Sequence, residues 1–315
     1  MMTVVTITMN PVIDASTSAN AVVPSKKTRC KAPVYEPGGG GINVSRALKK
    51  LGCDSMAVFF SGGRNGKILE QLIKNENINF RVLPTEESTR ENIMVMDNKT
   101  GEHYRFVMPG PNIKDNEWQS VLDLLDELSP LPDYLVASGS LPPGVPDDFY
   151  ARVAKWANKH DVKMILDTSG RGLKPALEEG VYLTKPNLRE LGELLNNENL
   201  TGMQLDEAAR EILAKRYTRI LVVSLGAKGA LLAQGDMLHY VVPPVMPVVS
   251  AVGAGDSMVA GILCGCLKGY WPQKAVHYGV AAGTAATMTP GSELCKKSDT
   301  DKIFKWLCTN RDEDE

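Results

Sequence analysis

The sequence predicts an α/β protein: a three-layer α/β/α sandwich with a mostly parallel central sheet, and a small separate β-sheet. From residue 114 onward, short apolar runs alternate with amphipathic segments of helical periodicity. Apolar strands separated by such helices are typical of a parallel sheet that is covered on both faces. Two β-rich segments, about residues 15–36 and 88–109, lie outside this alternation and predict the small sheet.

The composition is that of an ordinary globular protein, since 43% of the 315 residues are hydrophobic and 23% are charged. This length suits one large α/β domain or two small ones. Because no repeat or low-complexity linker divides the chain, we expect a single domain over residues 1–315. A net charge of −2 gives no sign of a nucleic acid or a membrane surface as a partner.

The cysteines and the apolar runs indicate a cellular compartment. The six cysteines form no Cys-x-x-Cys pair and the four histidines are scattered, so we interpret the cysteines as free thiols in a reducing cytosol. Residues 1–9 lack the basic region of a signal peptide. No apolar run reaches the roughly 18 residues that a membrane span needs. We therefore expect a cytoplasmic protein.

The secondary-structure elements follow from local patterns taken in order. A β-rich run at residues 4–9 ends at Asn10-Pro11, and two β-rich runs at residues 92–96 and 103–107 enclose a turn, which predicts a hairpin. The later alternation predicts strands at residues 134–137, 162–166, 181–184 and 220–223, and helices at residues 116–128, 147–159, 174–179, 187–196 and 206–215. Apolar residues at helical spacing predict further helices at residues 255–268, 273–288 and 300–307.

A run of four glycines, residues 38–41, precedes the first helix, whose apolar positions include Ile42, Val44 and Ala47. Glycine lets a ligand approach the backbone, and Asn43 in the first turn can point its amide at that ligand. Asp14 follows the first strand, at an edge of the sheet where ligands collect, so it is placed to bind hydroxyl groups. A turn-forming aspartate explains Asp14 equally well.

The segment before residue 257 has the features of a phosphate-transfer site. Gly253 and Gly255 stand where a loop becomes a helix, so a ligand can come close to the backbone. The free N–H groups of the first turn and the positive end of the helix dipole favour an anion there. Asp256 lies in the same turn and can accept a proton from a hydroxyl that attacks phosphorus. The alternative is that Asp256 only complements the helix dipole.

Polar or glycine-containing groups follow the predicted strands and should meet at one edge of the sheet. They are Ser138-Gly139-Ser140, Asp167-Thr168-Ser169, Lys185-Pro186-Asn187 and Ser224-Leu225-Gly226. The pair Asn187-x-x-Glu190 opens a helix and places an amide and a carboxylate on one face. Such a pair suits hydrated Mg²⁺ with phosphate, because Mg²⁺ keeps waters and takes few protein ligands. Helix capping by the same pair is the alternative.

Basic residues lie in both β-rich segments. A cluster around Lys27 has the pattern of a solvated face. Arg90 and Arg105 flank the predicted hairpin, and arginine can bind a phosphate through two parallel hydrogen bonds, although solvated charge explains them too.

Two common nucleotide-binding motifs are not met. Residues 62–68 are similar to a Walker A loop, but only three residues separate Gly62 from Gly66, and Ile68 replaces the required Ser or Thr. The dinucleotide fingerprint fails because Val44 and Met258 stand where its third glycine should be. These departures argue against a P-loop enzyme and against a Rossmann dehydrogenase.

Together the motifs resemble those of the ribokinase superfamily, and more closely those of its minor-type (B-type) phosphofructokinase branch. The resemblance covers essentially the whole chain and is carried by residues 37–47, 104–110, 138–144 and 253–257, with the Arg90 hairpin and Asn187-x-x-Glu190. It implies a ribokinase-like sandwich with a β lid made from the two early segments, and a homodimer formed through that lid. The superfamily commonly has Asp-Thr where Ser250-Ala251 stands here; Ser250 agrees with the phosphofructokinase branch, whereas Ala251 lacks a hydroxyl.

The resemblance also implies roles for individual residues. Asp256 would be the catalytic base, and the amides of Gly253, Ala254 and Gly255 would form an anion hole. The sugar phosphate would be bound by Asp14, Lys27, Gly39, Gly40, Asn43, Arg90 and Gly139. ATP would lie along Lys185, Asn187, Ser224, Leu225, Gly226, Lys228 and Gly229, with Glu190 arranging Mg²⁺ through water. A K⁺ ion would be bound by Ser250, Val252, Ala286, Thr289, Gly291 and Glu293.

The expected reaction is the phosphorylation of O1 of fructose 6-phosphate by ATP, giving fructose 1,6-bisphosphate, with Mg²⁺ accompanying ATP and K⁺ as a second cation. A tagatose-6-phosphate kinase and a 1-phosphofructokinase are the alternatives within the class, since basic residues do not say which carbon bears the phosphate. A non-catalytic sugar-phosphate sensor is the alternative from another class, because a fold alone does not establish activity.

Overall fold

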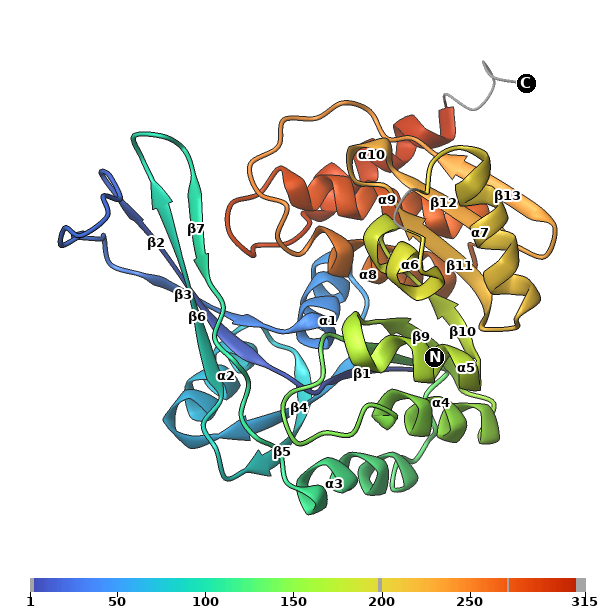
Figure 1. Cartoon of the computed structure of the whole chain (residues 1–315), viewed down its shortest axis with the longest axis horizontal. Coiled ribbons are helices and arrows are strands. Elements are labelled where there is room, and N and C mark those ends of the chain that lie inside the picture. Colours follow the sequence, from blue (N-terminus) through green and yellow to red (C-terminus); the bar gives the residue numbers. More distant parts are fainter. Residues whose placement is uncertain (1–2, 198–199, 271, 310–315) are drawn as a thin grey trace.

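A computed structural model describes residues 3–197, 200–270 and 272–309. The main body contains a nine-stranded sheet. Its strands are β1 (Val4–Thr8), β4 (Met56–Gly62), β5 (Asn79–Thr85), β8 (Tyr134–Ser138), β9 (Lys163–Asp167), β10 (Val181–Thr184), β11 (Thr218–Ser224), β12 (Ala230–Gln234) and β13 (Met237–Val241). They are ordered β13-β12-β11-β10-β9-β8-β1-β4-β5 (Figure 1). Neighbours from β11 to β5 are parallel, whereas β12 pairs antiparallel with both β11 and β13.

Helices cover both faces of this sheet. One face is covered by α1 (Gly40–Leu51), α2 (Gly63–Asn75), α8 (Ala254–Leu267), α9 (Gln273–Thr287) and α10 (Lys297–Thr309). The other is covered by α3 (Asp115–Asp126), α4 (Phe149–Lys159), α5 (Leu173–Glu179), α6 (Leu188–Leu195) and α7 (Met203–Ala214). Side chains alternate between the two cores along a strand: Ile220 and Val222 pack with α8 and α9, and Leu221 and Val223 pack with α7. The expected three-layer sandwich is confirmed.

A second, four-stranded sheet stands beside the main body (Figure 1). It consists of β2 (Val12–Ala19), β3 (Val34–Gly38), β6 (Arg90–Asp97) and β7 (His103–Phe106), in the order β3-β2-β6-β7. The parallel pairing of β2 with β6 joins segments that are far apart in the sequence. We call this assembly the small sheet. Its first strand begins at Val12 and β3 ends at Gly38, so the first segment is longer at both ends than the expected residues 15–36.

Every strand and helix expected from the sequence is present, with small differences at the ends. No element was expected at residues 56–85 or 230–241, where the structure has β4, α2, β5, β12 and β13. β5 is an edge strand that contains Pro84, a residue that weakens a strand pattern but is tolerated at an edge. β12 is buried along most of its length and shows no alternation. No helix in the described part of the chain is long and apolar enough to cross a membrane.

Candidate active site

Asp256 lies in the first turn of α8, where the carboxyl ends of the central strands meet. The helix begins after Gly253, which has a φ of 74°, a left-handed conformation that favours glycine. A side chain at Gly253 would also come within 2.3 Å of Leu294. From the start of α1, Asn43 donates a hydrogen bond from Nδ2 to Oδ2 of Asp256 at 3.0 Å. The starts of the two helices therefore meet at the carboxylate.

The surroundings of Asp256 raise the pKa of its carboxyl to about 6. Burial is the largest cause, because protein atoms surround the group and disfavour its charged form, and the charge of Asp167 is the next. The Asn43 hydrogen bond and the positive charges of Lys185 and Arg46 act in the opposite direction. The carboxyl can therefore take up a proton near neutral pH, as a general base must.

Lys185 brings a positive charge to the same point. Its side chain is buried, and Nζ forms an ion pair with Oδ1 of Asp167 at 3.2 Å. A Cβ at Gly255 would lie 3.3 Å from Nζ, so the ammonium group sits against the first turn of α8. Burial lowers the pKa of Lys185, but the charges of Asp167, Asp256 and Glu190 outweigh it and raise the pKa overall. The lysine stays protonated and can balance the charge of a phosphate.

Asn187 and Glu190 form a capping box at the start of α6. The Glu190 amide donates to Oδ1 of Asn187 and the Asn187 amide donates to Oε2 of Glu190, both at 2.9 Å. Asn187 and Glu190 therefore cap the helix, which is the alternative to a role in binding Mg²⁺. Burial raises the pKa of Glu190, and the charges of Asp167 and Lys185 also act on it, so the carboxylate is electrostatically part of the same site.

The expected ATP loop connects β11 to β12 beside this cap. Ser224 forms a β-bridge with Asn187, which ties the loop to the start of α6. A 3₁₀ turn follows at Gly226–Lys228, and the Leu225 amide donates to the Gly229 carbonyl at 2.8 Å. The Ser224 amide also donates to the Pro186 carbonyl at 2.9 Å, so the start of the loop lies beside the segment that carries Lys185 and Asn187.

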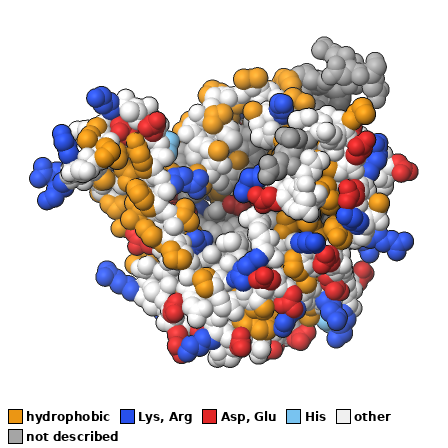
Figure 2. All heavy atoms as spheres, viewed as in Figure 1, with side chains coloured by type: hydrophobic (Ala, Val, Ile, Leu, Met, Phe, Trp, Pro, Cys, Tyr) orange, Lys and Arg blue, Asp and Glu red, His pale blue; other side chains and the backbone are white. Residues whose placement is uncertain are grey.

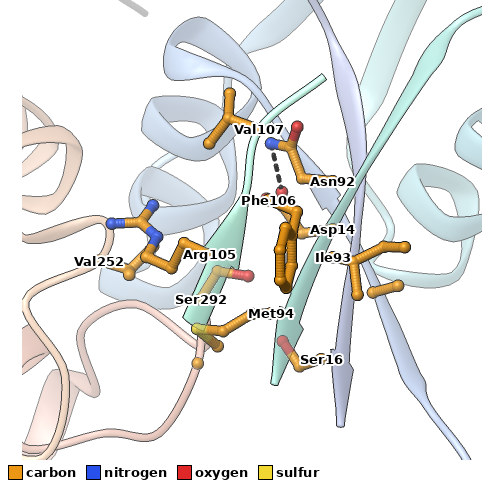
Figure 3. A pocket seen from close by; sticks show the side chains of 12 residues that line it. Asp14, Ser16, Asn92, Ile93, Met94, Arg105, Phe106, Val107, Val252 and Ser292 are labelled. Carbon is orange, nitrogen blue, oxygen red and sulfur yellow. Dashed lines mark hydrogen bonds between the residues drawn. The ribbon is translucent and has the colours of Figure 1, made fainter. Parts of the chain in front are cut away.

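A cleft separates the small sheet from the loop before α10, and Figure 3 shows its lining. Polar lining residues include Asp14, Ser16, Asn92, Arg105 and Ser292. Asp14 lies within β2 rather than in a loop after the first strand, and its Oδ1 accepts a hydrogen bond from Asn92 Nδ2 at 3.0 Å. Burial raises the pKa of Asp14. A carboxylate and an amide that face a cleft together suit hydroxyl groups.

Arg90 lies at the start of β6, close to this cleft. It donates to the carbonyls of Met108 and Asn10, both at 3.1 Å, while its buried Nε has no hydrogen-bond partner among the described residues. Burial lowers the pKa of Arg90, and the nearby charge of Asp14 opposes that shift. Part of the guanidinium is thus committed to the backbone.

The glycines before α1 bring that helix against the end of β8. Gly39 precedes the helix with a φ of 110°. A Cβ at Gly40 would lie 2.2 Å from Ser138 Oγ and 2.8 Å from the Gly139 amide, so no larger residue fits. The Gly139 amide donates to the Asp167 carbonyl at 3.0 Å, which limits its use for binding a phosphate.

The loop before α8 and the loop after α9 lie against each other. Ser250 Oγ donates to the Gly291 carbonyl at 3.1 Å, and Thr289 Oγ1 donates to the Ala286 carbonyl at 2.8 Å. The oxygen atoms offered here, with those of Val252 and Glu293, are carbonyls and hydroxyls, which suit a hard cation. Among the described residues, no group of three or more His, Cys, Asp and Glu could hold a metal ion.

Comparison with known proteins agrees with this geometry. The model of the "pfkB family carbohydrate kinase" matches residues 1–299. The chain belongs to the pfkB family of carbohydrate kinases.

Curated relatives of this kinase include two 6-phosphofructokinases and a 1-phosphofructokinase. The ATP-dependent 6-phosphofructokinase isozyme 2 of Mycobacterium tuberculosis is 43% identical over 96% of this chain and 89% of its own length. The enzyme of the same name from Escherichia coli is 39% identical over 98% of this chain and 99% of its own. The 1-phosphofructokinase of Bacillus subtilis is 31% identical over 90% of this chain and 92% of its own.

Solved structures of the Escherichia coli phosphofructokinase-2 superpose closely on the kinase. The complex with fructose-6-phosphate has a TM-score of 0.91 at 39% identity, covering 98% of this chain and 100% of the other. The complex with potassium has a TM-score of 0.93 at 40% identity, and a tetrameric inhibited form has 0.92 at 39%, each with the same coverage.

Lys27 of this kinase is not brought to the cleft. It is exposed in the segment of residues 20–33 that joins β2 to β3 at the far end of the small sheet (Figure 1). Among the described residues, those that line the cleft do not include it.

Two residues lie at the candidate site although the resemblance gave neither of them a role. Asp167 pairs with Lys185 and raises the pKa of Asp256. Its place directly after an expected strand was a signal for it. Arg105 lines the cleft on the side of Val252 (Figure 3), and its place in the second strand of the predicted hairpin was the corresponding signal.

Proposed function

We propose that this chain is an ATP-dependent 6-phosphofructokinase, which transfers the γ-phosphoryl group of ATP to O1 of fructose 6-phosphate. The observation that carries the proposal is Asp256, hydrogen-bonded to Asn43 in the first turn of α8 with the Lys185 ammonium close by. The names of relatives at 39–43% identity support it.

In the proposed reaction the O1–H bond breaks as the bond from O1 to the γ-phosphorus forms. The proton goes to Asp256, and the bond from the γ-phosphorus to the bridging oxygen breaks to release ADP. Phosphoryl transfer needs positioning and charge stabilisation more than covalent chemistry from the protein. Lys185 and the amides of Gly253, Ala254 and Gly255 would stabilise the charge on the transferring group. Asp167 would hold Lys185 in place.

The cleft beside the small sheet would bind the sugar phosphate. Asp14 and Asn92 would contact hydroxyl groups, and Arg90 and Arg105 would bind the phosphate already present. Gly39, Gly40 and Gly139 would contribute backbone contacts, because a Cβ at Gly39 or Gly40 would collide with its neighbours and Gly139 has a positive φ of 101°. Lys27 could join only by a movement of residues 20–33, or from a second chain.

ATP would lie along Lys185, Asn187 and the turn that contains Ser224, Leu225, Gly226, Lys228 and Gly229. The acidic groups near Lys185, Glu190 and Asp167, fit a hydrated Mg²⁺ ion, which would neutralise phosphate charge when bound. The carbonyl and hydroxyl oxygens of Ser250, Val252, Ala286, Thr289, Gly291 and Glu293 fit a K⁺ ion. The Escherichia coli structure with potassium supports that part of the proposal.

The small sheet would act as a lid and as a dimer interface, and the whole chain would work as one catalytic domain. Apolar side chains gather along the small sheet (Figure 2), and exposed ones include Val34, Tyr35, Ile93, Phe106 and Val107. The edge strands β3 and β7 also offer unpaired backbone groups. Two such surfaces could cover each other in a dimer. The Escherichia coli phosphofructokinase-2 also has a tetrameric inhibited form, and a tetramer of this chain would be a further assembly. Cys30, Cys53, Cys264, Cys266 and Cys295 are free thiols, which fits a cytoplasmic enzyme.

The test is the release of ADP by the purified protein with MgATP and KCl, with fructose 6-phosphate, tagatose 6-phosphate, fructose 1-phosphate and fructose compared by kcat/KM. We expect fructose 6-phosphate to be preferred. A preference for fructose 1-phosphate would make the chain a 1-phosphofructokinase like the Bacillus subtilis relative, and no turnover with any sugar would favour a sensor.

A further inference from the structure

Arg46 is a charged residue in the core, one helical turn after Asn43 on α1. Only 2% of its surface is exposed. A buried guanidinium is costly unless hydrogen bonds satisfy it. Nη1 donates to the carbonyls of Pro37 and Ser292 at 2.8 and 3.1 Å, and Nε donates to Oε1 of Glu76 at 2.8 Å. These partners come from different parts of the fold, so Arg46 connects segments that the chain alone does not.

One contact of Arg46 reaches the candidate site. Its Nη1 also lies 3.3 Å from Oδ1 of Asn43, whose Nδ2 donates to Asp256. A rotated Asn43 amide would place its NH₂ against the guanidinium and its oxygen against the carboxylate of Asp256. Both new contacts would be repulsive, so the guanidinium selects the orientation in which Asn43 donates to Asp256.

A second contact of Arg46 reaches the small sheet. Nη2 lies 3.4 Å from Oε1 of Glu36, a residue of β3. Oε2 of Glu36 accepts hydrogen bonds from Ser292 Oγ at 2.9 Å and from the Ser292 amide at 3.3 Å. The edge strand of the small sheet and the loop after α9 are therefore joined at the guanidinium that holds Asn43.

We propose that Arg46 is a positioning residue for phosphoryl transfer: it holds the Asn43 amide on Asp256 and ties that arrangement, through Glu36, to the small sheet. This inference rests on the proposed role of Asp256 as the base. A shift of β3 that moved Glu36 would act on Arg46 and so on the contact between Asn43 and Asp256. The site would be fully arranged only when the small sheet is in place.

The test is a double-mutant cycle with Arg46→Met and Asn43→Ala. Methionine has a similar length but no hydrogen-bond donor. We expect Arg46→Met alone to lower kcat by at least about tenfold, with KM for ATP little changed. In the Asn43→Ala background the same change should lower kcat by less than about twofold, because residues that act through one contact are not additive. Equal losses in the two backgrounds would overturn the proposal.

The pH profile gives a readout that a merely structural role would not move. Asn43, Asp167, Lys185 and Arg46 are the groups that act on Asp256. Removing the positive charge of Arg46 should shift the acid limb of kcat to higher pH. Arg46→Lys keeps a positive charge but cannot reach all the hydrogen-bond acceptors of the guanidinium. We therefore expect kcat to stay low, while the acid limb of its pH profile remains near that of the wild type. An unchanged limb in Arg46→Met would contradict the proposal.

Glu76→Gln is the matched control. It weakens the ion pair between Arg46 and the end of α2 but leaves the contact with Asn43. We expect a lower melting temperature with kcat within about twofold of the wild type. A fall in kcat as large as that of Arg46→Met would show that Arg46 acts only through general stability. If Arg46→Met does not fold, the cycle is run with Arg46→Lys. No ADP release by the wild type with any of the sugars would instead overturn the proposed function, whereas turnover retained by Asp256→Asn would overturn only the role of Asp256 as the base.

Discussion

The Nδ2 atom of Asn43 lies 3.0 Å from Oδ2 of Asp256, although 213 residues separate the two in the sequence. This contact joins the start of α1, beside the glycine run, to the start of α8. One hydrogen bond therefore connects the glycine run before α1 to the first turn of α8.

Asp256→Asn should lower kcat by about 10²–10⁴-fold, the usual contribution of a general base. Asparagine has nearly the same shape and can still accept the hydrogen bond from Asn43, so KM for both substrates should change little. Steady-state kinetics with MgATP and fructose 6-phosphate measure this. A loss of less than about tenfold would mean that another group takes the proton.

The same variant should be more stable than the wild type near neutral pH. The pKa of Asp256 is raised to about 6 in the folded protein, mainly by burial, above the value of 3.8 for an unperturbed aspartate. A group with a raised pKa destabilises the fold when it is ionised, so its cost builds up as the pH rises from 3.8 to about 6 and is complete above that. The gain should reach at most about 3 kcal/mol at pH 7.5 and vanish near pH 4, since one pKa unit is about 1.4 kcal/mol. Urea unfolding at both pH values tests this, and an equal gain at each would contradict it.

Asp167→Asn should move the acid limb of kcat to lower pH. In the wild type we expect kcat to fall as the pH drops through about 6, because a protonated Asp256 cannot accept the hydroxyl proton. The charge of Asp167 raises the pKa of Asp256, so removing that charge lowers it. The loss of the Asp167 ion pair should also make Lys185 less well placed and reduce the maximal rate. A limb shifted upward would mean that the site charges are assigned wrongly.

Local patterns predicted which elements form, but not which side chains meet. The alternation after residue 114 and the glycines around Asp256 are visible in short windows of sequence, and the structure places them as expected. The ion pair between Asp167 and Lys185 and the position of Asp14 within β2 depend on which strands lie side by side. Hydrophobic periodicity does not encode that order. For the same reason the sequence did not show that Lys27 lies away from the cleft.

Gly253→Ala should impair catalysis more than Gly269→Ala, although both change a glycine at an end of α8. Both glycines have a positive φ, 74° and 78°, so each substitution costs about 1–2 kcal/mol of backbone strain. At Gly253 the new Cβ would collide with Leu294, whereas at Gly269 no atom of the described residues lies within 4 Å. The collision should displace the first turn of α8 and lower kcat, while Gly269→Ala should lower only the melting temperature. Similar kcat values for the two variants would show that the position of this turn is not critical.

Val34→Lys should weaken self-association if the small sheet forms the dimer interface. Val34 lies on the edge strand β3 and is 63% exposed in the single chain. A lysine at an edge strand opposes pairing because its charge would have to be buried between the two chains. Light scattering at micromolar concentration should show a dimer for the wild type and mostly monomer for Val34→Lys. Met203→Lys is the control, because Met203 is 77% exposed on α7, away from the small sheet, and this variant should remain dimeric. A wild type that is monomeric, or a Met203→Lys variant that dissociates equally, would remove the support for an interface at the small sheet.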